Sequence, residues 1–217
     1  MTHRVQLRAV AGGLLLVTAA ACASGNGGPA PVLVNVGLPG EASTTTTMDN
    51  APKAVIPPYS KGDVDFISGM ITHHAQAIEM VNLLKIRTES ESMRMLGLRI
   101  EVSQNDEMAW MRRWLEERNQ PLPSEHAHHM PGGMMPGMLT MEEMDRLGKA
   151  KGPEFDRLFL EGMIKHHMGA LIMVEDLYKA PNSTQQAEIF DFAAHVDSDQ
   201  RMEIARMTQM LKTLTNK

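Results

Sequence analysis

FISGMITHHAQAIEMV (residues 66–81) is repeated later in the chain as FLEGMIKHHMGALIMV (residues 159–174), and this repeat predicts the fold. Residues 63–84 align without a gap on residues 156–177, and 11 of the 22 positions are identical. Identity at this level indicates an internal repeat rather than chance. In both stretches apolar residues recur every three or four positions, as on one face of a helix.

A second, weaker match shows that the repeated unit is longer than the His-His stretch. QNDEMAWMRRWL (104–115) aligns on QRMEIARMTQML (200–211), sharing a Gln-x-x-Glu motif followed by Met and Leu. Each unit is therefore a His-His helix followed by a Gln-x-x-Glu helix. Two such helix pairs predict an all-α protein, a four-helix bundle with approximate twofold symmetry.

Capping signals and breakers give the expected helix bounds. We expect the first helix from an N-cap at Asp63 to about residue 87, and the second over about 91–118. Thr140 and Glu143 form a capping-box pattern for a short extra helix in the central connection, and Ser183 with Gln186 does so for the last helix. The third helix is expected over 153–179, starting at Pro153.

The N-terminal region has the pattern of an export signal followed by a tether. Residues 1–21 combine an early positive charge with a short apolar run, as in a lipoprotein signal peptide. TAAAC resembles a lipobox, which would make Cys22, the chain's one cysteine, the lipidated residue. Residues 22–60 are rich in Gly, Ser, Thr and Pro and predict a disordered tether. The bundle domain is then 61–217, with repeat one at 61–120, a His/Met loop at 121–139 and repeat two at 153–215.

Charge and composition narrow the class of function. The net charge is −5, so no basic field favours a nucleic-acid partner. Methionine is abundant, with 20 residues in 217. Methionine fills cores, and its thioether is also a soft metal ligand. We expect a protein that is not an enzyme.

Helical spacing places polar and thioether groups on inward faces. Imidazole and carboxylate groups are costly to bury unless they find hydrogen-bond partners or a metal. In repeat one the candidate ligands are Met70, His73, His74, Met80 and Glu107; in repeat two they are Met163, His166, His167, Met173 and Glu203. His73 and His166 share a stripe with the methionines, which ranks them above His74 and His167.

The mixture of imidazole and thioether favours copper, as Cu(I), over iron or zinc. The loop supplies a second candidate set: His126, His128, His129 and Met130. Two alternatives remain open. The histidines and glutamates could form an internal polar network in a structural or adaptor subunit, or they could hold iron in a di-iron bundle, although no Glu-x-x-His motif lies on the His-His helices.

Three further motifs carry a resemblance to a known family. GMITHHAQAIEMV, MPGM and EFDRLFLEGMIKHHMGALIMV, with the Gln-x-x-Glu helices, resemble domain-of-unknown-function family 305 over about residues 61–215. The resemblance implies a ferritin-like helical bundle that is exported, and it implies copper, since some members are Met/His-rich copper-binding proteins. It implies metal roles for the eight His and Met residues of the repeated His-His helices.

These expectations combine into one hypothesis. The chain would be an exported copper-binding protein, held at the extracytoplasmic face of the cell membrane through a lipid on Cys22, that sequesters copper or passes it on. An envelope protein could receive the copper, and the bundle could form oligomers.

Overall fold

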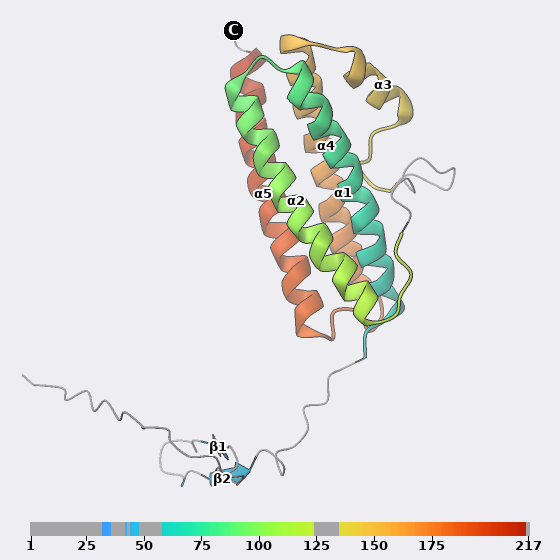
Figure 1. The fold of residues 1–217 in the computed structure, drawn as a ribbon, viewed down its shortest axis with the longest axis vertical. Coiled ribbons are helices and arrows are strands. Elements are labelled where there is room, and N and C mark those ends of the chain that lie inside the picture. Colours follow the sequence, from blue (N-terminus) through green and yellow to red (C-terminus); the bar gives the residue numbers. More distant parts are fainter. Residues whose placement is uncertain (1–31, 36–41, 43, 48–57, 124–134, 216–217) are drawn as a thin grey trace, which may run out of the picture. The chain divides into compact units, whose positions relative to one another are not determined.

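A computed structural model describes residues 32–35, 42, 44–47, 58–123 and 135–215 (Figure 1). The chain divides into two units, Met1–Ala54 and Val55–Lys217. In the first unit β1 (Val32–Asn35) pairs antiparallel with β2 (Thr44–Thr47), with Val32 opposite Thr47. These strands lie within the predicted tether. Runs of Val and Thr favour extended backbone, a local signal that the overall composition of the segment did not predict.

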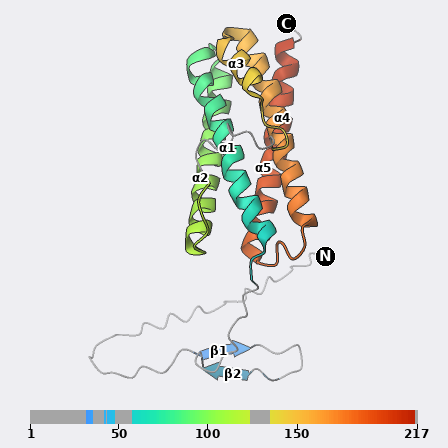
Figure 2. The ribbon, with the colours of Figure 1, turned by 90° about the vertical axis from the view of Figure 1, so that its right-hand side faces the viewer.

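The second unit contains five helices: α1 (Lys61–Arg87), α2 (Glu91–Glu117), α3 (Met141–Lys149), α4 (Gly152–Lys179) and α5 (Ala187–Thr215). The four long helices form two antiparallel pairs, α1 with α2 and α4 with α5, and α1 lies beside α4 (Figures 1 and 2). This confirms the all-α four-helix bundle with a short extra helix in the central connection. Among the helices of the described part, none combines the length and apolar character that a membrane span needs.

The start of α1 differs from its prediction. The N-cap is Ser60, and Asp63 is the third residue of a capping box in which its side chain accepts from the Ser60 N–H at 2.7 Å. The other Asp63 oxygen accepts from the Thr184 N–H at 2.9 Å. Asp63 is fully buried because it joins the start of α1 to the α4–α5 connection. Its counterpart in the repeat, Asp156, bonds to Thr88 in the α1–α2 connection.

The predicted capping box at the start of the last helix is wrong. Helix α5 begins at Ala187, and the Gln186 carbonyl accepts from the N–H groups of Ile189 and Phe190. The Ser183 hydroxyl instead bonds to the Ser60 hydroxyl at 2.9 Å. A tertiary contact across the end of the bundle therefore uses the side chain that the local pattern assigned to the cap. The Thr140–Glu143 capping box of α3 is confirmed.

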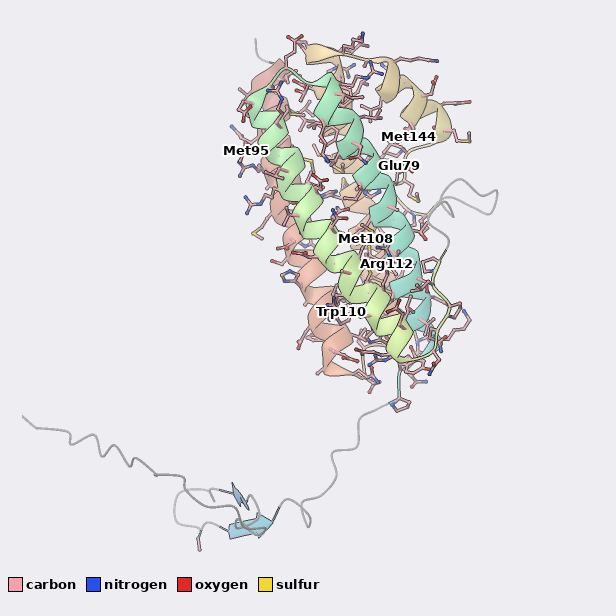
Figure 3. The ribbon with its side chains drawn as sticks, in the orientation of Figure 1. Glu79, Met95, Met108, Trp110, Arg112 and Met144 are labelled. Atoms are coloured by element: carbon pink, nitrogen blue, oxygen red, sulfur yellow. The ribbon has the colours of Figure 1, made fainter. Side chains whose placement is uncertain are left out.

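Two apolar clusters fill the bundle, one on each side of its middle. The lower cluster is built around Phe66, Met70, Trp114 and Val174. Trp110, labelled in Figure 3, packs against it by stacking on Phe192. The upper cluster includes Met80, Leu96, Leu147, Phe159, Met163 and Met207. Met144 of α3, labelled in Figure 3, packs against it. Between the clusters lies a buried polar layer, consisting of His73, His74, Gln104, Glu107, His166, His167, Gln200 and Glu203.

Candidate metal centre

Four buried imidazoles form the centre of the polar layer. His73 and His74 come from α1, and His166 and His167 come from the antiparallel α4; each side chain is at most 1% exposed. The His73 and His166 rings lie against each other, with centroids 3.8 Å apart and planes inclined at 38°. The internal repeat therefore brings its two His-His pairs together across the approximate twofold axis.

The inner pair, His73 and His166, bonds to backbone carbonyls. His73 Nε2 lies 3.0 Å from the Pro136 carbonyl oxygen, and His166 Nε2 lies 3.0 Å from the carbonyl oxygen of His73. A carbonyl oxygen only accepts hydrogen bonds, so Nε2 carries the proton in both rings. In the neutral form of each ring, Nδ1 then bears a free lone pair.

The outer pair bonds to carboxylates from the second helix of each repeat. His74 Nε2 lies 2.6 Å from Glu107 Oε2, and His167 Nε2 lies 2.6 Å from Glu203 Oε2. These are the partners expected of the polar-network alternative. Both glutamates are nearly buried, so each carboxylate needs the imidazole N–H to compensate for lost hydration.

All four imidazoles leave the same atom unused. None of the four Nδ1 atoms has a hydrogen-bond partner among the described residues, and all four atoms are buried. A histidine that binds a metal through one nitrogen usually donates its other N–H to a carboxylate or carbonyl oxygen. Each ring of the layer already has that outer hydrogen bond, which leaves Nδ1 as the nitrogen that could bind a metal. Within the described residues, no three of these imidazoles place a nitrogen within 4.8 Å of one another.

Burial keeps the inner imidazoles neutral. Desolvation, followed by repulsion from His74, lowers the pKa of His73 from 6.5 to about 3, although the Pro136 carbonyl opposes the shift. Desolvation and then repulsion from His73 lower the pKa of His166 well below 6.5. Protons therefore do not compete with a metal ion for these nitrogens near pH 7.

The segment around Pro136 lies close to the imidazoles because Gly137 and Gly169 leave room for it and the Gln76 amide holds it in place. Gly137 adopts φ +75°. If Gly169 of α4 carried a Cβ, that atom would lie only 2.7 Å from the Gly137 Cα. The side chain of Gln76 exchanges two hydrogen bonds with the Leu139 backbone, at 2.9 and 2.8 Å. Sequence reasoning missed these positioning roles; MPGM (135–138), quoted for the family resemblance, was the signal that could have indicated them.

Gly169→Ala is expected to destabilise the protein by about 1–3 kcal/mol, as overpacking commonly does. The new Cβ would lie 1.9 Å from the Pro136 carbonyl oxygen, so the segment must move away from His73. Gly148→Ala in α3 is the matched control, since its nearest neighbour is 3.9 Å away and alanine favours a helix. Urea unfolding of both variants checks this, and an alanine at 169 as stable as glycine would contradict it.

The candidate methionines that share a stripe of α1 lie on opposite sides of the imidazole layer. Met70 and Met80 are about 15 Å apart along α1, so they cannot bind one ion together. Met70 belongs to the lower cluster, where Met173 packs, and Met80 lies with Met163 in the upper cluster. Thioethers thus flank the imidazole layer on both sides, each set drawn from both repeats.

Met135 adds a further thioether on the lower side. Met135 Sδ lies 3.5 Å from the position that a Cβ on Gly69 would take, and Met173 Cε lies 3.4 Å from the same position. The predicted loop candidates, His126, His128, His129 and Met130, lie outside the described residues, as do the signal peptide and Cys22.

The fold and the imidazole layer belong to a known protein family. A family model described as a domain of unknown function, DUF305, matches residues 63–211. The chain belongs to this family. The match spans both helix pairs and the polar layer, which confirms the resemblance inferred from the repeated motifs. Comparison with curated proteins finds no match.

Solved structures of family members share the fold. A DUF305 fragment from Deinococcus radiodurans is 30% identical, with a TM-score of 0.63 over 72% of this chain and 99% of that one. A DUF305 protein from Streptomyces coelicolor, expected to be secreted, is 28% identical, with a TM-score of 0.62 over 71% and 94%. CopM in its Cu(II)-bound form is 28% identical, with a TM-score of 0.58 over 70% and 96%.

Proposed function

We propose that this protein binds copper as Cu(I) in the cell envelope, and sequesters it or passes it on without catalysing a reaction. One observation carries the proposal: four buried imidazoles each donate Nε2–H to an oxygen and keep Nδ1 free. A buried polar atom without a partner destabilises a fold, so its repetition in four rings favours a ligand.

The donor set favours copper. Imidazole nitrogen and thioether sulfur together suit Cu(I), whereas hard cations prefer oxygen. Met70, Met135 and Met173 lie on one side of the imidazoles, with Met80 and Met163 on the other. The similarity to CopM, which has been solved with Cu(II) and with Cu(I) at 28% and 27% identity, supports the same choice.

The iron alternative has less support from the layer. Di-iron bundles use four glutamates on inward faces. Among the described residues, Glu107 and Glu203 are the buried glutamates, and each already accepts from an imidazole.

The proposed location is the extracytoplasmic face of the membrane. The lipobox-like sequence before Cys22 supports export and lipid attachment. The similarity to a Streptomyces coelicolor protein expected to be secreted also favours export. The bundle would then hold copper outside the cytoplasm and deliver it to an envelope partner.

Cu(I) titration of His73→Gln combined with His166→Gln tests the proposal. Glutamine keeps an N–H donor near the position of Nε2 and removes the Nδ1 lone pair. We expect the doubly substituted protein to remain folded by circular dichroism and to lose at least one equivalent of bound Cu(I). Met141→Ala removes an exposed thioether, 75% accessible, and is the control expected to bind as wild type.

Unchanged Cu(I) stoichiometry and affinity in the His73→Gln, His166→Gln protein would overturn the assignment to the bundle. Elemental analysis after native purification provides a second measurement. Protein without metal but with a stable envelope partner would favour the adaptor alternative instead.

A further inference from the structure

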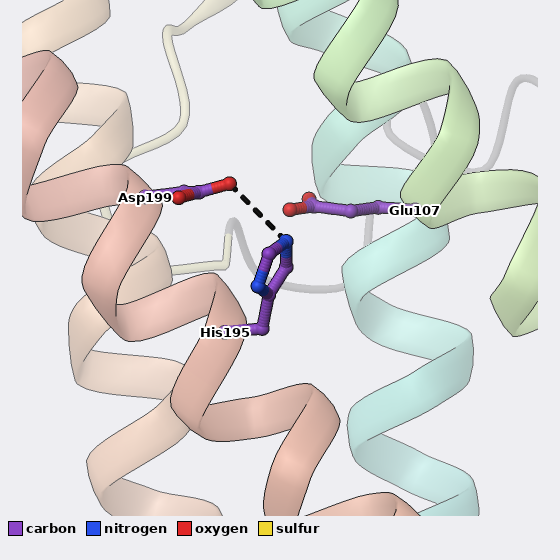
Figure 4. A group of neighbouring side chains, drawn as sticks. All are labelled: Glu107, His195 and Asp199. Atoms are coloured by element: carbon purple, nitrogen blue, oxygen red, sulfur yellow. Dashed lines mark ion pairs between the residues drawn. The ribbon is translucent and has the colours of Figure 1, made fainter. Parts of the chain in front are cut away.

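A second group of ligand-type side chains lies between α2 and α5. Glu107, His195 and Asp199 each offer one atom, and these atoms all lie within 4.8 Å of one another. His195 Nε2 is 3.3 Å from Asp199 Oδ2. Figure 4 shows the imidazole pointing between the two carboxylates, which approach it from opposite helices.

Glu107 supplies an oxygen that the fold leaves unsatisfied. The residue is 5% exposed, and its Oε2 accepts from His74. Its Oε1 is buried and has no hydrogen-bond partner within the described residues. An unpaired carboxylate oxygen in a buried position costs free energy that a bound cation would offset.

The other two residues are open to solvent. The side chain of His195 is 64% exposed and that of Asp199 is 26% exposed. Asp199 also lines a surface groove of about 690 Å³ between α2 and α5. The His195 imidazole and the Asp199 carboxylate are therefore accessible to an ion from solvent, beside the buried Glu107 carboxylate.

The approximate twofold symmetry allows the two halves of the bundle to be compared at this place. The comparison shows that packing alone does not require His195 and Asp199. The shift of 96 that relates Glu107 to Glu203 places Arg99 and Ser103 at the positions of His195 and Asp199. Arg99, Ser103 and Glu203 line the same groove. Both halves thus keep the buried Glu–His pair, but only one half surrounds its glutamate with an imidazole and a second carboxylate.

We propose that Glu107, His195 and Asp199 form a site for a divalent cation of borderline softness, Zn(II) or Cu(II). One imidazole nitrogen and two carboxylate oxygens suit such ions, with water completing the coordination. The site contains no thioether, which separates it chemically from the Cu(I) layer. Glu107 links the two, because its other oxygen orients His74.

Zn²⁺ titration by calorimetry tests this site. The full chain carries His126→Asn, His128→Asn and His129→Asn, so that the loop histidines do not compete. We expect His195→Ala, and separately Asp199→Asn, to weaken binding of one Zn²⁺ at least ~10-fold, since losing even an outer partner of a ligand has effects of that order. Asp197→Asn is the control: this carboxylate lies on the same helix and pairs with Arg201.

A gain of binding provides the converse measurement. Arg99→His with Ser103→Asp places the same three residue types around Glu203, and should raise the Zn²⁺ stoichiometry by one. Repeating the titration with Cu²⁺ shows which of the two ions the site prefers. Zn²⁺ binding by His195→Ala and Asp199→Asn that equals the parent protein would overturn the proposal.

The Cu(I) proposal and the Zn²⁺ proposal can be tested independently of each other. His195→Ala should retain Cu(I) binding, and the His73→Gln, His166→Gln protein should retain Zn²⁺ binding. Loss of Zn²⁺ from the latter protein, with its fold intact, would contradict a site separate from the imidazole layer.

Discussion

Acidification of the metal-free protein below pH 6.5 is expected to lower the free energy of unfolding by up to ~1.4 kcal/mol per pH unit for each of His73 and His166. Both rings are buried in neutral form, and burial lowers the pKa of His73 from 6.5 to about 3 and that of His166 well below 6.5. In the unfolded chain the same rings take up a proton near pH 6.5.

The direction of the pH effect on stability follows from the difference in pKa between the folded and unfolded states. Between pH 6.5 and about 3 the unfolded state binds more protons than the folded state, so the folded state loses stability as the pH falls. Above pH 6.5 both states are neutral at these rings and the contribution is flat. With two rings the slope reaches ~2.7 kcal/mol per unit, which predicts acid unfolding well above pH 3.

Urea unfolding at a series of pH values measures the slope. The His73→Gln, His166→Gln protein is the matched control, because glutamine has no titrating group, and its stability should depend much less on pH in this range. Equal slopes for this protein and the wild type would show that other groups cause the acid transition.

His167→Leu is expected to lower the free energy of unfolding by about 3 kcal/mol, the upper part of the usual cost of leaving a buried polar group without its hydrogen-bond partner, since that group is a carboxylate. The change leaves the Glu203 carboxylate, 6% exposed, without the N–H that lies 2.6 Å from Oε2. The leucine itself fits an apolar surrounding, so the destabilisation comes from the carboxylate.

Adding Glu203→Leu to His167→Leu should recover most of the loss, because replacing both partners with apolar groups is often neutral or stabilising. Chemical denaturation of the two single variants and the double variant gives the coupling energy directly. Additive effects of the two substitutions would contradict the pairing. A stable double variant would also show that folding does not require this His–Glu pair.

Much of the fold could be predicted from the sequence, because it depends on periodicity that local residues carry. The repeat of residues 63–84 in 156–177 predicted two helix pairs, and the structure confirms the bundle and the short helix after Thr140. The His-His pairs were predicted to face inward, and all four rings are buried. Helical spacing determines which face a side chain occupies, so these features required no tertiary information.

Other features depend on contacts between distant residues. Spacing placed Met70 and Met80 on one stripe but could not show that the polar layer divides them between two clusters. The Ser183 hydroxyl was assigned to a cap and instead bonds to Ser60. His195 and Asp199 were not predicted as ligands, since only packing of α5 against α2 brings them to Glu107.

The helix pairs, their symmetry and the inward position of each His-His pair were predictable, because these follow from repeated residues at helical spacing. Which ring nitrogen is free depends instead on contacts between distant residues. The Pro136 carbonyl reaches His73 across a loop, and Glu107 and Glu203 reach His74 and His167 from other helices. Hydrogen-bond partners set the proton position in a neutral imidazole, and these partners are distant in the chain.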